Sequence, residues 1–239
     1  MVGAINAHEK RDVVTADLPG AFLNTVTDEL VFMVLKGELC ELMVRVNPKI
    51  YRRYVTTDKK GNPVLYVQLY KLMYGLLRSA LLFYRKLRAE LEDFGFVINP
   101  YDPCVANRIL ESGKQQTVLW HVDDLMMSHV EPDENTKLLE YLKDIYGDKM
   151  TIKRGTHHRY LGMDMDFSKP GVLGISMIKY IDEVIEDFPE LITKTSRTPH
   201  TDNLFKVRPE SEATFLSKEQ AQQFHRTVAQ LLFLSCRAR

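Results

Sequence analysis

The chain has 239 residues, of which 45% are hydrophobic and 27% charged, and its 32 basic residues balance its 32 acidic ones. This composition is ordinary for one large or two small folded domains, and it excludes a disordered, collagenous or coiled-coil chain. No apolar run approaches the roughly 18 residues of a membrane-spanning helix. Three separated cysteines without a Cys-x-x-Cys pair argue against a zinc site or a disulfide scaffold and favour a reducing compartment.

Predicted strands and helices are interleaved along the chain. β-Branched and alternating apolar runs predict strands at residues 12–17, 30–35, 64–69, 105–110, 117–121, 125–130, 160–167 and 172–177. Apolar residues at helical spacing predict helices at residues 72–94, 134–146, 179–187 and 217–239. Ser217 and Gln220 form a capping box for the last helix, and the polar residues 193–212 are the best linker candidate. The pattern predicts the α+β class.

Charge is distributed unevenly along the chain. Residues 41–90 contain eleven basic and three acidic side chains, a net charge of +8, whereas residues 121–148 contain eight acidic and two basic ones, a net charge of −6. The neutral total argues against a nucleic-acid partner, because phosphates favour a basic protein. The basic segment can be a solvated surface, but together with a separate carboxylate cluster it matches the needs of a phosphate-transfer enzyme.

Asp123 and Asp124 are the strongest candidates for chemistry. They lie between two apolar runs in TVLWHVDDLMMSH (117–129), which predicts a hairpin with the aspartates at its tip. Adjacent carboxylates resist joint ionisation, and a divalent cation relieves that cost. Oxygen ligands suit Mg²⁺ or Mn²⁺. The alternative is an ordinary polar turn, in which Asp is common.

Asp17 supplies a third carboxylate. It ends a β-branched segment and is followed by Leu-Pro-Gly-Ala-Phe. If its strand lies beside the hairpin, the three carboxylates can bind two metal ions for phosphoryl transfer. The pair His157 and His158 has no third ligand at a suitable spacing, and we expect it in a loop near solvent.

Five segments in order resemble a known family. They are DLPGAFL (17–23), KLMYGLLRSALLFY (71–84), YDPCV (101–105), HVDD (121–124) and YLGM (160–163). Together they resemble the reverse transcriptase of copia-type LTR retrotransposons. The closing FHRTVAQLLFLSCRAR is similar to the segment that precedes this family's ribonuclease H region. The resemblance covers residues 12–239.

The resemblance implies a polymerase palm, with an antiparallel sheet and backing helices, partial fingers and a C-terminal thumb-like helical segment. It implies palm and partial fingers in residues 1–168. Residues 169–239 would form a primer-grip and thumb-like region leading toward a missing ribonuclease H domain. Few residues precede Asp17, and the chain ends inside an apolar helix, so we expect a fragment of a longer polyprotein.

The same resemblance assigns catalytic roles to the three carboxylates. Asp17 and Asp123 would hold two Mg²⁺ or Mn²⁺ ions directly, and Asp124 would contribute less. The Leu18 carbonyl would complete a metal shell. A primer 3′-hydroxyl would then attack the α-phosphate of a dNTP, and pyrophosphate would leave.

Further contacts are implied around these carboxylates. Phe22 would pack under the sugar and exclude a 2′-hydroxyl, or it is a core aromatic. Tyr74 and Gly75 would line the nucleotide, although Tyr74 can equally serve helix packing. Arg78 would contact the nucleotide or remain solvated. The nucleic-acid contacts implied are His121, Arg85, Lys86, Tyr160, Leu161 and Gly162.

The implied partners are an RNA or DNA template with its primer and a dNTP, without a membrane, and dimerisation is left open. The implied location is intracellular, in the cytoplasm within a virus-like particle or in the nucleus. The family's hairpin usually begins with Tyr where this chain has His121, which can stack or hydrogen-bond near the primer terminus. Alternative hypotheses are a truncated, inactive retroelement fragment that at most binds nucleic acid, and a metal hydrolase acting on small esters.

Overall fold

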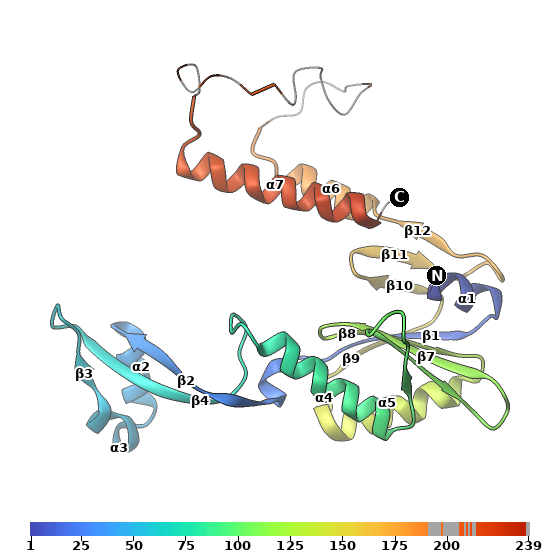
Figure 1. Cartoon of the computed structure of the whole chain (residues 1–239), viewed down its shortest axis with the longest axis horizontal. Coiled ribbons are helices and arrows are strands. Elements are labelled where there is room, and N and C mark those ends of the chain that lie inside the picture. Colours follow the sequence, from blue (N-terminus) through green and yellow to red (C-terminus); the bar gives the residue numbers. More distant parts are fainter. Residues whose placement is uncertain (191–196, 198–205, 208, 210, 212–213, 238–239) are drawn as a thin grey trace.

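The computed structural model describes residues 1–190, 197, 206–207, 209, 211 and 214–237. Within them, helices and antiparallel strands form a mixed α+β fold, as predicted (Figure 1). The helices are α1 Val2–His8, α2 Glu38–Val46, α3 Pro48–Tyr51, α4 Ser79–Asp93, α5 Pro132–Tyr146, α6 Ile178–Glu186 and α7 Lys218–Arg237. The predicted linker at 193–212 lies outside the described residues except at isolated positions.

A 6-stranded antiparallel sheet with the order β5-β6-β7-β8-β1-β9 forms the centre of the molecule. Its strands are β1 Asp12–Asp17, β5 Val97–Ile98, β6 Val105–Ile109, β7 Gln115–His121, β8 Asp124–His129 and β9 Thr151–Arg154. Helices α4 and α5 cover one face (Figure 1). α4 buries Phe83, Leu87 and Leu91 at i, i+4 and i+8, each contributing about 1.5–3 kcal/mol. This packing fixes the central strands against the helices.

A smaller sheet covers the other face of the central strands. It has the order β10-β11-β12, with β10 His157–Tyr160, β11 Met163–Asp166 and β12 Gly174–Ser176. Tyr160 and Met165 of this sheet pack against Val13 of β1 and Met126 of β8. β1 and β8 are therefore buried on both faces, which explains their nearly continuous apolar sequences. The predicted boundary between residues 168 and 169 falls between β11 and β12, which pair with each other.

A third sheet forms an arm that extends from the central sheet (Figure 1). It has the order β2-β4-β3, with β2 Val26–Lys36, β4 Pro63–Lys71 and β3 Thr56–Thr57. Cys40 of α2 packs against Leu35 and Leu65 on one face of this sheet. The arm therefore has a small core of its own.

Two predicted boundaries are wrong. The predicted helix 72–94 begins only at Ser79, because Gly75 has a φ of +92° and the Ser79 hydroxyl donates to the Met73 carbonyl at 2.7 Å. The predicted strand 160–167 is a hairpin, because Leu161 and Gly162 both have positive φ and form its turn. In both cases a turn divides a run of apolar residues that the sequence pattern alone assigns to one helix or one strand.

The prediction of a loop for the histidine pair is also wrong. His157 and His158 begin β10, and the side chain of His158 is only 2% exposed. Its Nδ1 is 3.2 Å from the Thr15 hydroxyl, and its Nε2 is 2.7 Å from the Gly155 carbonyl. His158 therefore joins the small sheet to β1. At the other end of the chain the capping box is confirmed, since the Ser217 hydroxyl accepts from Gln220 N–H at 3.2 Å and the Gln220 side chain accepts from Ser217 N–H at 3.0 Å.

His158 predicts a pH dependence of folding. Burial lowers its pKa below 6.5, so the folded state disfavours the charged imidazolium. Its contribution to stability is present above pH 6.5 and is lost as the pH falls through the lowered pKa, at up to about 1.4 kcal/mol per pH unit. Urea unfolding at several pH values below 6.5 should show a flatter dependence for His158→Gln than for the wild type. The neighbouring exposed His157→Gln is the control, and an equal flattening in both variants contradicts the prediction.

Candidate functional site

Strand pairing gathers the three predicted carboxylates at one end of the central sheet. β1 and β8 run antiparallel, and Asp17 is directly opposite Asp124 in their register. The Leu18 N–H donates to the Asp123 carbonyl at 3.0 Å, which extends the pairing by one step. The Leu18 carbonyl, an expected metal ligand, accepts from the Ala21 N–H at 3.2 Å and keeps a second lone pair. Residues more than a hundred positions apart thus share one site.

The hairpin that presents Asp123 has an unusual backbone. His121 pairs with Asp124, which leaves Val122 and Asp123 as the two turn residues. Val122 has a φ of 58°, a left-handed conformation that β-branched residues rarely adopt and that glycine normally supplies at the first turn position. Such strain concentrates at functional sites. The prediction of a hairpin with the aspartates at its tip is confirmed, with Asp123 in the turn and Asp124 beginning β8.

Two of the three carboxylates, Asp17 and Asp124, have raised pKa values. The pKa of Asp17 is raised, first by burial and then by the nearby charges of Asp123 and Asp124. The pKa of Asp124 is raised by burial and by Asp123, and His121 has the opposite effect. All three side chains remain partly exposed. This end of the sheet therefore concentrates negative charge where water and ions have access.

Tyr74 connects the carboxylates to an aromatic cluster. Its hydroxyl donates to Asp123 Oδ2 at 2.8 Å, which raises the pKa of Tyr74. Its ring lies 4.5 Å from the ring of Phe22, centroid to centroid, and Phe22 contacts Phe83 at 5.9 Å. Phe22 is buried in the main core, whereas Tyr74 is exposed and follows Met73 in the turn before α4. The exposed ring of Tyr74 thus covers the buried ring of Phe22 beside Asp123, and Gly75 provides the turn.

The predicted basic contacts have different surroundings. Arg78 forms ion pairs with Asp28 and Glu29 of β2. Lys86 pairs with Glu90 and lies 4.5 Å from the ring centroid of Tyr146 in the cation–π arrangement. Arg85 is exposed, and its side chain has no hydrogen bond or ion pair within the described residues.

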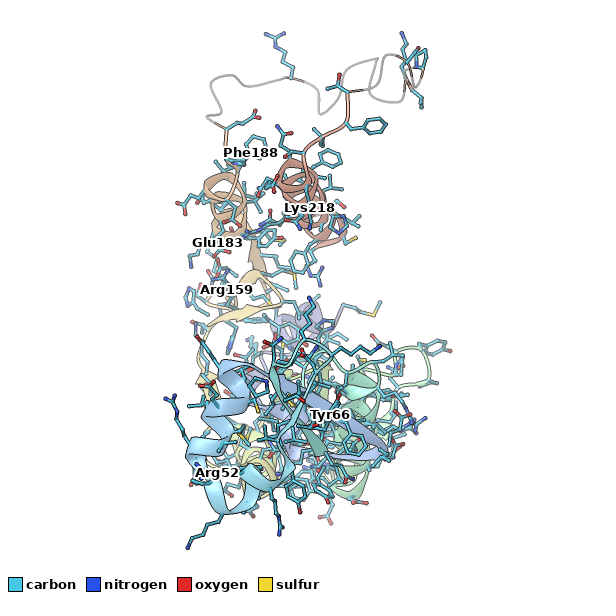
Figure 2. All side chains as sticks on the ribbon, turned by 90° about the vertical axis from the view of Figure 1, so that its left-hand side faces the viewer. Arg52, Tyr66, Arg159, Glu183, Phe188 and Lys218 are labelled. Carbon is cyan, nitrogen blue, oxygen red and sulfur yellow. The ribbon has the colours of Figure 1, made fainter. Side chains whose placement is uncertain are left out.

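Three of the predicted nucleic-acid contacts, Tyr160, Leu161 and Gly162, lie at the turn between β10 and β11. Tyr160 is buried, and its pKa is raised by burial and then by Asp124. A Cβ on Gly162, whose φ is +77°, would come within 3.1 Å of Phe233 in α7, so this turn fits closely against the helix. Arg159, the residue before Tyr160, pairs with Glu183 of α6 at 3.0 Å (Figure 2). The turn therefore links the β10-β11-β12 sheet to the two C-terminal helices.

One cavity of about 170 Å³ brings the carboxylates and the β10–β11 turn together. It is lined by Asp17, Asp124 and Tyr160, together with Lys153 and Arg159. Sequence reasoning missed the last two. Lys153 lies on β9, a short strand that the sequence pattern does not predict. It reaches the site because the strand register places it opposite Thr15 of β1.

Carboxylate oxygens are suitable ligands for Mg²⁺ or Mn²⁺. The pKa values of Asp17 and Asp124 are raised, first by burial and then by neighbouring carboxylates, and a bound cation would oppose both shifts. Within the described residues, however, no group of three or more His, Cys, Asp or Glu side chains has the arrangement of a metal site. The hydrogen bond from Tyr74 engages one of the Asp123 oxygens. The donor chemistry fits divalent ions, while the side chains are not arranged as a finished ligand set.

Comparison with known proteins leaves the family open. No protein-family model matches the chain, and no curated protein matches it. Similar solved structures include apo telomerase from Candida tropicalis, at 12% identity and a TM-score of 0.38, with 70% of this chain and 32% of that chain covered. Telomerase from Candida albicans in complex with a TWJ fragment of telomeric RNA has 9% identity and a TM-score of 0.40, with 74% and 35% covered.

The chain thus spans about a third of the length of these telomerase chains, and TM-scores this low assign neither fold nor function. Within the described residues, no helix is long and apolar enough to cross a membrane.

Asp17→Asn should stabilise the protein in metal-free buffer at neutral pH. Because the pKa of Asp17 is raised in the fold, its ionisation opposes folding above that pKa, and the cost disappears as the pH falls below the ordinary value of 3.8. Because Asp17 is partly exposed and solvent screens its charge, removing the charge should gain up to about 1 kcal/mol. Chemical unfolding with EDTA measures it, and the exposed Asp148→Asn is the control. A variant less stable than the wild type at pH 7 would refute the prediction.

Proposed function

We propose that the chain is the RNA-directed DNA polymerase domain of a copia-type retrotransposon, transferring a nucleotide from a dNTP to a primer 3′-hydroxyl. The observation that carries the proposal is the register that places Asp17 opposite Asp124, with Asp123 in the adjoining turn. Three carboxylates at one sheet end are the donor set that two-metal nucleotidyl transfer requires. The ordered sequence motifs supply the family.

In this proposal Asp17, Asp123, Asp124 and the Leu18 carbonyl would hold two Mg²⁺ or Mn²⁺ ions. Such ions, when bound, lower the pKa of an attacking hydroxyl and stabilise a departing pyrophosphate. The chain itself keeps the carboxylates together through the β1–β8 pairing and through the strained Val122 turn. Preorganised charge of this kind avoids reorganisation during the reaction.

The aromatic pair would position the nucleotide. Tyr74 is exposed beside Asp123, and Phe22 supports it from below. A sugar resting against this pair would meet a wall that leaves little room for a 2′-hydroxyl, which favours deoxynucleotides. Arg85, which has no partner among the described residues, could contact a phosphate, whereas Arg78 would first have to leave Asp28 and Glu29.

A second candidate function is nucleic-acid binding without turnover. It is favoured by the Tyr74–Asp123 hydrogen bond and by the lack of a finished metal-ligand set among the described residues. Binding of a primer–template that weakens with salt, without any extension, would select this candidate.

Primer extension on an RNA template with Mg²⁺ or Mn²⁺ and dNTPs tests the proposed reaction. Wild-type protein should extend the primer, and Asp123→Asn should reduce the rate by at least about 10²–10³-fold, the size expected when preorganised charge is removed from a reaction site. Asp148→Asn, a surface carboxylate of the same acidic segment, should retain the wild-type rate. Equal background extension by wild type and Asp123→Asn would reject catalysis by this chain.

Tyr74→Phe tests whether Tyr74 competes with a metal ion for Asp123. The substitution keeps the ring on Phe22 and removes a hydrogen bond of about 0.5–1.5 kcal/mol, so Mn²⁺ should bind roughly two- to tenfold more tightly. Electron paramagnetic resonance of free Mn²⁺ measures this without requiring turnover. Tyr66→Phe is the matched control, because Tyr66 is also exposed and its hydroxyl has no partner in the described part of the chain. Equal affinity in both variants would show that the hydrogen bond does not limit metal binding.

A further inference from the structure

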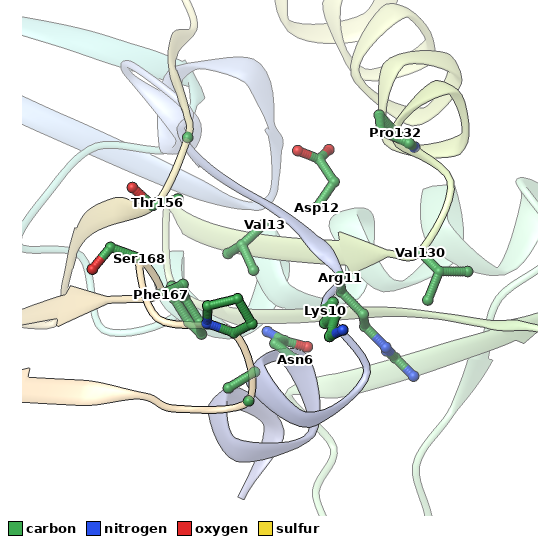
Figure 3. Close-up of a pocket in the computed structure, with 14 residues that line it drawn as sticks. Asn6, Lys10, Arg11, Asp12, Val13, Val130, Pro132, Thr156, Phe167 and Ser168 are labelled. Atoms are coloured by element: carbon green, nitrogen blue, oxygen red, sulfur yellow. The ribbon is translucent and has the colours of Figure 1, made fainter.

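A cavity of about 460 Å³ lies at the opposite end of β1 from Asp17 (Figure 3). The end of α1, the start of β1, the first residue of α5, the β9–β10 turn and the loop between β11 and β12 surround it. Since β1 contains six residues and a strand rises about 3.3 Å per residue, the cavity is roughly 16 Å from Asp17. Its volume falls in the range of small-molecule sites, and the proposed polymerase reaction does not use it.

Asn6 brings a polar group without a partner to the wall of this cavity. Its side chain is only 1% exposed. Asn6 Oδ1 accepts a hydrogen bond from the Ser128 hydroxyl at 2.8 Å, whereas Nδ2 has no partner among the residues that the structure describes. Turning the amide over would exchange the two ends and leave the oxygen unpaired instead. Buried polar atoms without partners are rare, and because Asn6 lines the cavity, a water molecule or a ligand entering from the cavity is the available partner for this amide.

Lys10 gives the cavity a positive charge. It has a φ of 53°, which a residue with a Cβ adopts rarely, and its ammonium has no ion pair or hydrogen bond in the described part of the chain. The other charged residues of the wall are already paired. Arg11 contacts Glu9 at 2.9 Å, and Asp12 contacts Arg154 at 3.5 Å. The uncompensated charge is therefore positive, and it attracts an anion.

The rest of the wall is largely apolar. Val13, Phe167 and Pro170 line the cavity, and Figure 3 shows Phe167 and Ser168 on one side with Asn6 and Lys10 nearer the centre. One ammonium and one amide match a singly charged carboxylate, whereas phosphate is typically held by arginine forks or clustered backbone N–H groups. We infer that this cavity binds a small organic carboxylate, with its charged group at Asn6 and Lys10 and its apolar body against Phe167.

Benzoate is the probe, and binding to the full chain is measured by calorimetry and ligand-observed NMR. Benzoate should bind saturably, and benzyl alcohol, which has the same ring without the charge, should bind at least tenfold more weakly. Lys10→Asn should weaken benzoate about tenfold, because the charge is lost while Asn tolerates positive φ. Asn6→Asp should also weaken it, since it keeps the acceptor for Ser128 but presents a negative charge. Circular dichroism checks that each variant is folded.

Two further variants complete the design. Lys10→Arg keeps the charge and should retain binding. Lys114→Asn removes an exposed charge from the β6–β7 turn and should leave binding unchanged. Absence of saturable binding, equal affinity for benzoate and benzyl alcohol, or tighter binding of inorganic phosphate than of benzoate would overturn the inference. So would wild-type affinity in Lys10→Asn. None of these readouts depends on primer extension, so the result is independent of the proposed polymerase activity.

Discussion

The pairing of β1 with β8 is the constraint on which the candidate site depends. It places Asp17 opposite Asp124 and continues through the Leu18–Asp123 hydrogen bond. A slip of one residue in this register would turn every side chain of β1 to the opposite face, burying one set of polar groups and separating the carboxylates. The same register thus determines both which side chains enter the core and where the carboxylates of the site lie.

The packing of β1 and β8 must also offset the free-energy cost of the charged and strained residues at the site. Burial, and then the neighbouring carboxylates, raise the pKa values of Asp17 and Asp124, and Val122 holds a strained conformation that costs about 1–3 kcal/mol. Burial of β1 and β8 on both faces offsets this cost, with Phe83 of α4 on one side and Tyr160 of β10 on the other. Both strands that carry the carboxylates are interior strands, since β8 pairs with β7 and β1, and β1 pairs with β8 and β9.

Sequence reasoning found those parts of the molecule that are determined locally. The HVDD hairpin, the class of fold and the capping box at Ser217 each follow from neighbouring residues. One error was local, because the Gly75 turn delays the start of α4. Other features depend on distant residues, since the burial of His158 depends on Thr15. The Tyr74–Asp123 hydrogen bond joins residues 49 positions apart, and neither residue carries a local signal for it.

The ion pairs of the structure show where the excess positive charge of the basic segment, residues 41–90, lies. Within the basic segment, Arg78, Lys86 and Arg88 have carboxylate partners of their own, so the excess positive charge lies mainly on the arm, where Arg52 extends outward (Figure 2). Exposed charges are screened over about 8–10 Å at physiological salt. Positive charge on the arm therefore does little to offset the negative charge of Asp123 over longer distances. Opposite charge elsewhere in the chain thus balances the total, whereas the basic residues that share a cavity with Asp17 and Asp124 are Lys153 and Arg159, which lie outside the basic segment.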